Sequence, residues 1–165
     1  MIANFLPASL HRALLPYAHV LRKRWRRWRA TPFSGVSAVV TNRAGDVLLV
    51  RHSYGTPDWS LPGGGLGQGE DPEAGLHREI GEELALALDQ VRLVHSVDEV
   101  LYNSPHTGHL FAATCDAQPA PDGREVIEAR FFAAHALPPD LCRTAASRID
   151  IWREWARTQG TGAHS

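Results

Sequence analysis

Three glutamates in the middle of the chain have the type and spacing to do chemistry. Glu79, Glu82 and Glu83 stand at positions i, i+3 and i+4, and on a helix they share about a third of the circumference. Like charges at this spacing destabilise a helix by about 0.2–0.5 kcal/mol per pair. A Mg²⁺ or Mn²⁺ ion would convert that repulsion into coordination, because hard cations prefer carboxylate oxygen. The alternative is a solvated acidic helix face.

A glycine-rich segment lies directly before these glutamates. Its glycines are Gly63, Gly64, Gly65, Gly67 and Gly69. A glycine loop that runs into a helix N-terminus presents backbone N–H groups to an anion. The anion site and the carboxylates together predict phosphate chemistry at a metal ion, which favours a functional acidic face over a solvated one.

The spacing of residues 64–86 resembles the Nudix box. The family pattern is G-x5-E-x7-R-E-U-x-E-E-x-G-U, where U is a bulky aliphatic residue. The matching residues are Gly64, Glu70, Arg78, Glu79, Ile80, Glu82, Glu83 and Leu86, which is eight of nine fixed positions. The lead-in Trp59–Gly63 is also similar to that of the family. Such a match is far more specific than a lone glycine motif.

One position departs from the pattern. Ala85 stands where the family has glycine. If this residue needs a positive φ, alanine costs about 1 kcal/mol. Alternatively, the helix continues through Leu86, Ala87 and Leu88. Neither alternative removes a metal ligand.

The resemblance implies a hydrolase that uses Mg²⁺ or Mn²⁺ and cleaves a phosphoanhydride bond. Its substrate would be a nucleoside diphosphate linked to another group, of the nucleotide-sugar, ADP-ribose or nucleoside-triphosphate type. The resemblance assigns the metal to Glu79, Glu82 and Glu83, with Glu79 also a candidate base toward the attacking water. It gives Arg78 and Glu70 a positioning role as an ion pair.

Further candidates are less tightly specified. The backbone carbonyl of Gly63 or Gly64 completes the metal shell in relatives. A carboxylate outside the box is expected from Glu125 or Glu128, each of which is otherwise an ordinary surface glutamate. The candidates for substrate binding are Arg51, Gly64, Gly65, Tyr54 and Tyr102.

Several polar and aromatic side chains outside the box have structural alternatives. Arg51 can hold a phosphate or pair with a surface acid. Tyr54 and Tyr102 can stack on a base or belong to the core or its rim. His106 and His109 have a spacing that metals use on helices, but without a helix here a loop or strand end is the better interpretation.

The elements that must position these residues follow from periodicity. Alternation and turn residues predict a hairpin from Gly35–Val40 and Val47–Val50, and a short strand at Trp59–Leu61. Asp71 and Pro72 predict the start of a helix whose buried face carries Leu76, Ile80 and Leu84. The remaining expected elements are strands at Val91–Val100, His109–Cys115 and Val126–Phe132, and a helix near Ala145–Thr158.

This alternation favours a single layered α/β domain with a mixed sheet. The resemblance implies the Nudix α/β/α sandwich over residues 32–159. Residues 1–31 are expected to form a basic amphipathic helix, and residues 160–165 a loose tail.

Charge is unevenly distributed along the chain. Residues 1–30 carry seven Lys and Arg and no Asp or Glu, which is a charge of +7. Because the net charge of the chain is −1, the other 135 residues carry −8. The basic segment could pack on its own protein, on a second copy in a homodimer, or on anionic lipid. It could also grip RNA, which makes a 5′-end RNA pyrophosphohydrolase the second hypothesis. A non-catalytic nucleotide-binding module is the third, disfavoured by three intact glutamates.

Composition sets the remaining expectations. Apolar residues make up 44% of the chain and charged residues 21%, which allows a buried core. The two cysteines, Cys115 and Cys142, indicate neither a disulfide framework nor a zinc site. The start of the chain does not read as a signal peptide. The expected location is the cytoplasm.

Overall fold

The computed structural model describes residues 33–101 and 104–161. The elements in chain order are β1 (Phe33–Thr41), β2 (Val47–His52), β3 (Gly63–Gly65), α2 (Pro72–Leu84), β4 (Asp89–Leu101), β5 (Ser104–Thr114), β6 (Val126–Phe132) and α3 (Arg143–Thr161). The expected N-terminal helix and the residues from 162 onward lie outside this range, as does Tyr102. Among the described helices, none has the length and apolarity to cross a bilayer.

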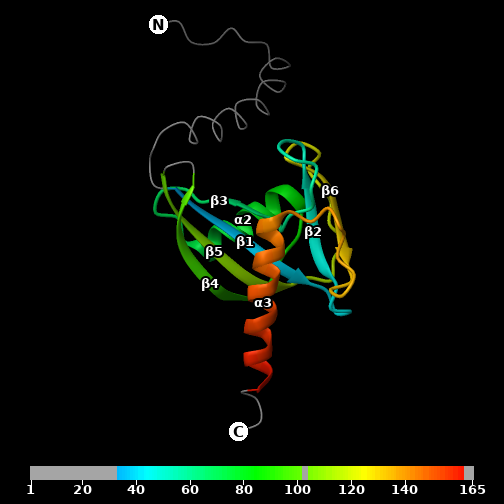
Figure 1. The fold of residues 1–165 in the computed structure, drawn as a ribbon. Coiled ribbons are helices and arrows are strands. Elements are labelled where there is room, and N and C mark those ends of the chain that lie inside the picture. The colour runs from blue at the N-terminus through cyan, green and yellow to red at the C-terminus, as the bar shows by residue number, and fades with distance from the viewer. Residues whose placement is uncertain (1–32, 102–103, 162–165) are drawn as a thin grey trace, which may run out of the picture.

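The strands form one mixed sheet. Its order is β4-β5-β1-β2-β6, with β3 paired to β1 off this path. β1 runs parallel to β5, while the other pairs are antiparallel. Helices α2 and α3 lie on opposite faces of the sheet (Figure 1). The expected α/β/α sandwich with a mixed sheet is therefore confirmed.

The third strand is not where the sequence placed it. Trp59 and Ser60 make only isolated bridges, to Leu141 and Val50, and the strand beside β1 is formed by the glycines of β3 instead. Trp59 is occupied elsewhere: its N–H donates to Asp140 and its carbonyl accepts from Cys142. The glycine segment was expected to be a loop, and it is extended because it hydrogen-bonds along β1.

The hairpin between β1 and β2 follows its turn residues. Asn42 accepts the N–H of Asp46 on its side chain at 2.9 Å, and Gly45 takes a φ of 81°. The two strands pair only beside this turn, at Thr41 and Val47. Further along, residues 35–37 of β1 pair with β3 instead. This pairing places the glycines of β3 in contact with α2.

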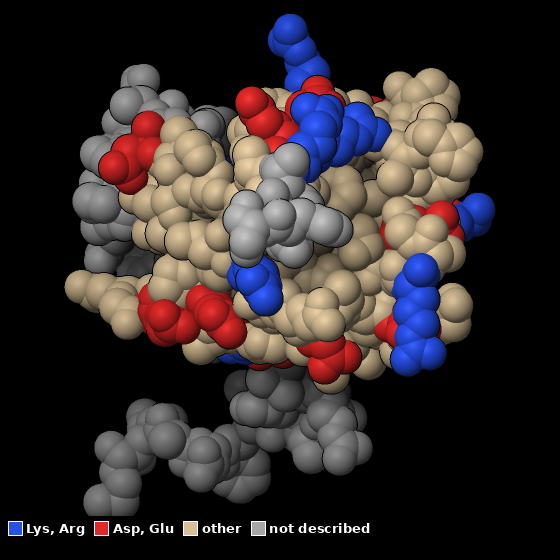
Figure 2. Space-filling view, turned by 90° about the horizontal axis from the view of Figure 1, so that it is seen from below, with Lys and Arg blue, Asp and Glu red and all other residues tan. Residues whose placement is uncertain are grey.

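Charged side chains of both signs are interspersed on the surface. In the view from below, basic and acidic side chains lie close together at several places rather than in one field of a single sign (Figure 2). This face by itself does not indicate a single-sign binding surface.

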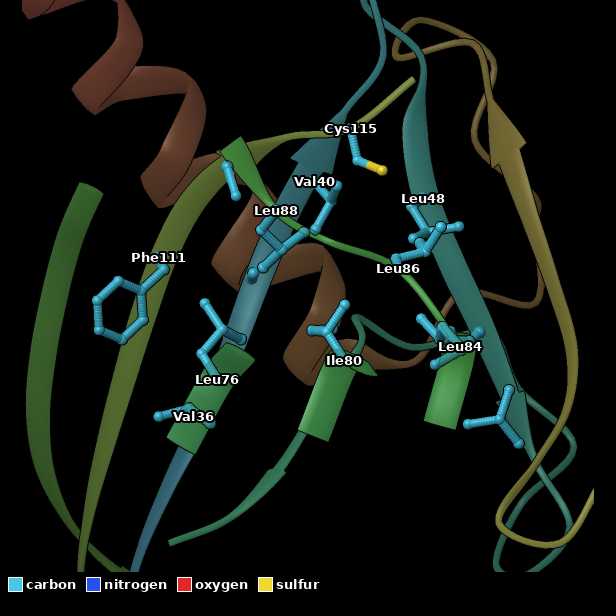
Figure 3. Packing of buried hydrophobic residues seen from close by; sticks show 14 residues of the cluster. Val36, Val40, Leu48, Leu76, Ile80, Leu84, Leu86, Leu88, Phe111 and Cys115 are labelled. Carbon is cyan, nitrogen blue, oxygen red and sulfur yellow. The ribbon is translucent and has the colours of Figure 1, made fainter. Parts of the chain in front are cut away.

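The α2 face of the sheet holds the larger part of the core. Leu76, Ile80 and Leu84 are at most 1% exposed, and they pack on side chains from β1, β2 and β5 (Figure 3). The step of four residues along α2 aims all three at the sheet. This packing fixes how α2 is turned about its axis, and so where its glutamates lie.

The α3 face has its own core. Val47 and Leu49 of β2 point to it, with Trp59 and Ile149. Because side chains alternate along a strand, Leu48 and Val50 point to α2 instead. This alternation decides which residues of β2 and β6 can reach α2.

Candidate active site

Helix α2 is defined at both ends by local hydrogen bonds. The Asp71 side chain accepts the N–H of Ala74 at 2.9 Å, and Pro72 occupies the first turn, where its missing N–H costs nothing. Ala85 ends the helix in the left-handed region, at φ 54° and ψ 36°. Of the two alternatives for Ala85, the structure adopts the positive φ.

The Glu79 carboxylate lies against the backbone of β3. Glu79 is only 4% exposed. A Cβ added to Gly64 would stand 2.3 Å from its Cδ and Oε2, so the carboxylate occupies the space that any other residue at position 64 would fill. Gly64 lies opposite Val36 in the β1–β3 register.

Arg78 connects the acids at this end of α2. Its Nε and Nη2 donate to the two oxygens of Glu70 at 2.7 and 2.9 Å, and Nη1 donates to Glu79 at 2.9 Å. Glu70 also accepts the N–H of Gly67 at 2.5 Å. The ion pair expected between Arg78 and Glu70 is present. It raises the pKa of Arg78 above its ordinary value, chiefly through the Glu70 hydrogen bond and against an opposing effect of burial.

The three glutamates do not share one environment. Glu83 is 6% exposed, close to the value for Glu79, whereas the Glu82 side chain is 53% exposed and 3.7 Å from Arg78 Nη1. Within residues 33–101 and 104–161, no three Asp, Glu, His or Cys side chains are grouped closely enough to hold an ion by themselves. Two of the three candidate acids, Glu79 and Glu83, are therefore buried one helical turn apart.

The two candidates for a carboxylate outside the box, Glu125 and Glu128, differ in burial and in their ion-pair partners. Glu125 is 7% exposed and directly precedes β6 beside the end of α2. Glu128 pairs with Arg51 at 3.1 Å and Arg130 at 2.5 Å. Glu128 stands opposite Arg51 in the β2–β6 register, and a register shift between Arg51 and His52 separates it from Val126. Its side chain therefore lies on the α3 face, whereas Val126 packs on the α2 face.

Arg51 lies on the same α3 face. It pairs with Asp140 as well as Glu128 and stacks 4.5 Å from the ring of Trp59. It shares its side of β2 with Val47 and Leu49, which pack towards α3. The structure adopts the acid-pairing alternative for Arg51, and phosphate binding by this residue stays a prediction.

The remaining candidates give little support to a site. Tyr54 is 43% exposed, and its ring centroid lies 5.4 Å from that of His52. The carbonyl of Gly65 accepts a hydrogen bond from Arg78 Nη2 at 3.3 Å. His106 and His109 both lie on β5, and three residues apart on a strand means opposite faces. They do not converge on one ion.

Sequence reasoning missed Asp122. Its Oδ1 accepts the N–H groups of Arg124, Glu125 and Val126, so it shapes the loop that carries Glu125. The available signal was the Asp122-Gly123 pair, typical of a tight turn. Nothing in the sequence tied that turn to α2.

Comparisons with known proteins show the family of this chain. The family model described as NUDIX domain matches residues 31–153. An RNA pyrophosphohydrolase of Actinobacillus succinogenes is 32% identical over 72% of this chain and 58% of its own length. One of Photorhabdus laumondii is 43% identical over 37% of this chain and 34% of its own. The chain thus spans less than two thirds of the length of these curated relatives.

A solved structure has the same fold. The MutT NUDIX hydrolase from Burkholderia pseudomallei is 25% identical, with a TM-score of 0.64 over 73% of this chain and 97% of that one.

Proposed function

The chain belongs to the NUDIX domain family, and from this premise we propose that it is a pyrophosphohydrolase dependent on a divalent metal ion. It cleaves a phosphoanhydride bond in a nucleoside diphosphate linked to another group. The observation that carries the proposal is the Glu79 carboxylate, buried against a glycine backbone and held by Arg78. Burying a charged group is costly unless it is paired, and this one is paired with Arg78.

The residues fit a divalent ion. Gly64 leaves a space that a Cβ would fill, and that space holds carboxylate oxygens, the ligand type that Mg²⁺ and Mn²⁺ prefer. Glu79 and Glu83 would hold the ion, with Glu82, Glu125 and the Gly63 carbonyl as further donors. Such ions are usually bound by few carboxylates, and water and substrate phosphate fill the rest of the shell.

The chain's own residues then have distinct tasks. Arg78 is fixed by hydrogen bonds to both carboxylate oxygens of Glu70. It in turn holds the Glu79 carboxylate in one orientation. Glu79 takes the proton from the attacking water, which adds to phosphorus as the anhydride bond breaks. Glu70 fixes the glycine segment through the N–H of Gly67. A bound divalent ion supplies neutralisation of the diphosphate and stabilisation of the leaving phosphate.

A product-resolved screen tests the proposal. Nucleotide sugars, ADP-ribose, nucleoside triphosphates and 5′-triphosphate RNA are incubated with the protein and Mg²⁺ or Mn²⁺, and products are separated by chromatography. At least one compound should be cleaved at its anhydride, and Glu79→Gln should lower that rate by about 10²-fold or more. Glu73→Gln, an exposed residue of the same helix, is the matched control. Absence of turnover by the wild type, or full activity of Glu79→Gln, would contradict the proposal.

A second candidate is hydrolysis at the 5′ end of RNA. It is supported by the relatives named RNA pyrophosphohydrolase and by the basic segment of residues 1–30. Cleavage of the RNA in preference to every small compound in the screen would favour it. A non-catalytic binding module predicts binding without turnover in all cases.

A further inference from the structure

Glu125 is a buried acid whose backbone is held from two sides. It is 7% exposed. Its carbonyl accepts the N–H of Ser53 at 2.9 Å, and its own N–H donates to Asp122 Oδ1 at 3.1 Å. The Ser53 hydroxyl also donates to the neighbouring carbonyl of Arg124 at 2.6 Å. The end of β2 therefore fixes one side of this residue, and Asp122 fixes the other.

The Asp122 carboxylate organises the turn. One oxygen accepts three successive N–H groups, from Arg124, Glu125 and Val126, at 3.0, 3.1 and 3.0 Å. Gly123 closes the same turn, with a φ of 69° and its N–H on the Val126 carbonyl at 3.0 Å. Hydrogen bonds to an ionised acceptor are about twice as strong as neutral ones. Without the carboxylate, three N–H groups of the turn lose their acceptor.

The same residue is tied to α2. The N–H of Asp122 donates to the carbonyl of Glu83 at 2.9 Å, and the N–H of Ala120 donates to that of Leu84 at 2.8 Å. These carbonyls belong to the last turn of a helix and have no partner within it. One residue thus joins the backbone of buried Glu83 to that of buried Glu125.

We propose that Asp122 is a positioning residue that holds Glu125 against α2, so that the Glu125 carboxylate acts together with Glu79 and Glu83. This inference rests on the proposed function, and it assigns Asp122 no contact with substrate. The effect of its carboxylate on activity passes through Glu125. Because Asp122 is exposed, its truncation leaves no cavity in the core.

Three variants of the full chain test it: Asp122→Ala, Asp122→Asn and Asp116→Ala. Asparagine keeps an oxygen that can accept the three N–H groups. Asp116 is the matched control, since its carboxylate also accepts a backbone N–H, from Arg43 at 2.8 Å, in a different loop. Each is measured for kcat and KM on the substrate found by the screen, and for binding of Mn²⁺ alone by electron paramagnetic resonance.

Asp122→Ala should lower kcat by about 10–100-fold, as loss of an outer-shell partner typically does, with KM nearly unchanged. It should weaken Mn²⁺ binding, whereas Asp122→Asn recovers most of both and Asp116→Ala matches the wild type. In a Glu125→Gln background, Asp122→Ala should cause no further loss. A full additional loss in that background, or wild-type kcat and Mn²⁺ binding in Asp122→Ala, would overturn the inference.

The two proposals fail separately. If the wild type turns over no compound, the proposed function falls, and the Mn²⁺ titrations of the same variants still decide the role of Asp122. If the wild type is active and Asp122→Ala is indistinguishable from it, only the inference about Asp122 falls.

Discussion

At Gly64 the absence of a side chain decides where the Glu79 carboxylate lies. The distance of 2.3 Å from a notional Cβ to that carboxylate is too short for both to keep their places. The carboxylate is the far end of a flexible side chain, so it moves before the backbone does. The motif's first glycine is explained by space for an acid rather than by backbone angles.

Gly64→Ala should therefore damage activity more than stability. Displacing a reacting group by about 1 Å can cost about 10²-fold in rate, and we expect a fall in kcat of this order. The melting temperature should change little. Steady-state kinetics and thermal unfolding check both, with Gly81→Ala as control because Gly81 has open space around its notional Cβ. Equal activity of the two variants would contradict this account of Gly64.

Arg78 is a residue that lysine should not replace. Its planar group binds both oxygens of Glu70 and also reaches Glu79, a geometry that a single ammonium group cannot reproduce. Arg78→Lys should lower kcat by about 10-fold or more, while Arg43→Lys, at an exposed surface pair, should not. Wild-type kcat in Arg78→Lys would show that the bidentate contact is dispensable.

The charge of Arg78 does not produce a pH dependence in the usual range. Its pKa is raised above an already high ordinary value. The stability linked to such a group is fully present below the pKa of the unfolded chain and is lost only as pH rises through the folded pKa. A pH profile of activity near neutrality therefore does not report on Arg78.

At the scale of elements, α2 could be predicted almost completely from the sequence. Its cap, its first proline and its buried stripe are all local signals, whereas its end at Ala85 was left open between two alternatives. The short strand β3 could not be predicted, because glycine has no strand propensity and the strand exists only through its pairing with β1. Long-range pairing of this kind leaves no local pattern.

Which side of β2 and β6 faces α2 could not be predicted from the sequence either. Alternation shows that Arg51 shares a side with Val47 and Leu49, but both sides of β2 are apolar, so it does not show which side faces α2. The sequence could therefore place Glu79 and Glu83 on α2 and leave Arg51 and Glu128 undecided. Tertiary packing assigned both to α3.

The left-handed end of α2 gives a prediction about stability. A non-glycine residue in this region is strained by about 1–2 kcal/mol. Glycine removes this strain, but part of the gain is lost because glycine raises the entropy of the unfolded chain. Ala85→Gly should raise the free energy of unfolding by about 1 kcal/mol and leave kcat unchanged. Urea denaturation measures the first quantity. A destabilised Ala85→Gly protein would mean that the αL end is not strained.

At the scale of the whole molecule, the basic segment separates the two substrate hypotheses. Residues 1–30 carry a charge of +7, and phosphate contacts by such residues make nucleic-acid binding salt-dependent. If the segment grips RNA, its deletion should lower turnover of 5′-triphosphate RNA by about 10-fold or more at moderate salt. Turnover of small substrates should persist, and it also reports that the truncated protein is folded.

The outcome of this deletion is decisive in either direction. Equal loss on RNA and on small compounds would indicate that the segment supports the domain itself. Unchanged turnover of both would remove it from substrate recognition and leave packing, a second copy or a lipid surface as its role.

The central claim is that buried glutamates on α2 bind a divalent ion beside a diphosphate. Titration calorimetry with Mn²⁺, in the presence of a non-hydrolysable nucleoside diphosphate analogue, measures this directly. The account predicts saturable binding by the wild type and by Glu73→Gln, and binding at least about 10-fold weaker for Glu83→Gln. No Mn²⁺ binding by the wild type, or the same affinity in all three proteins, would contradict it.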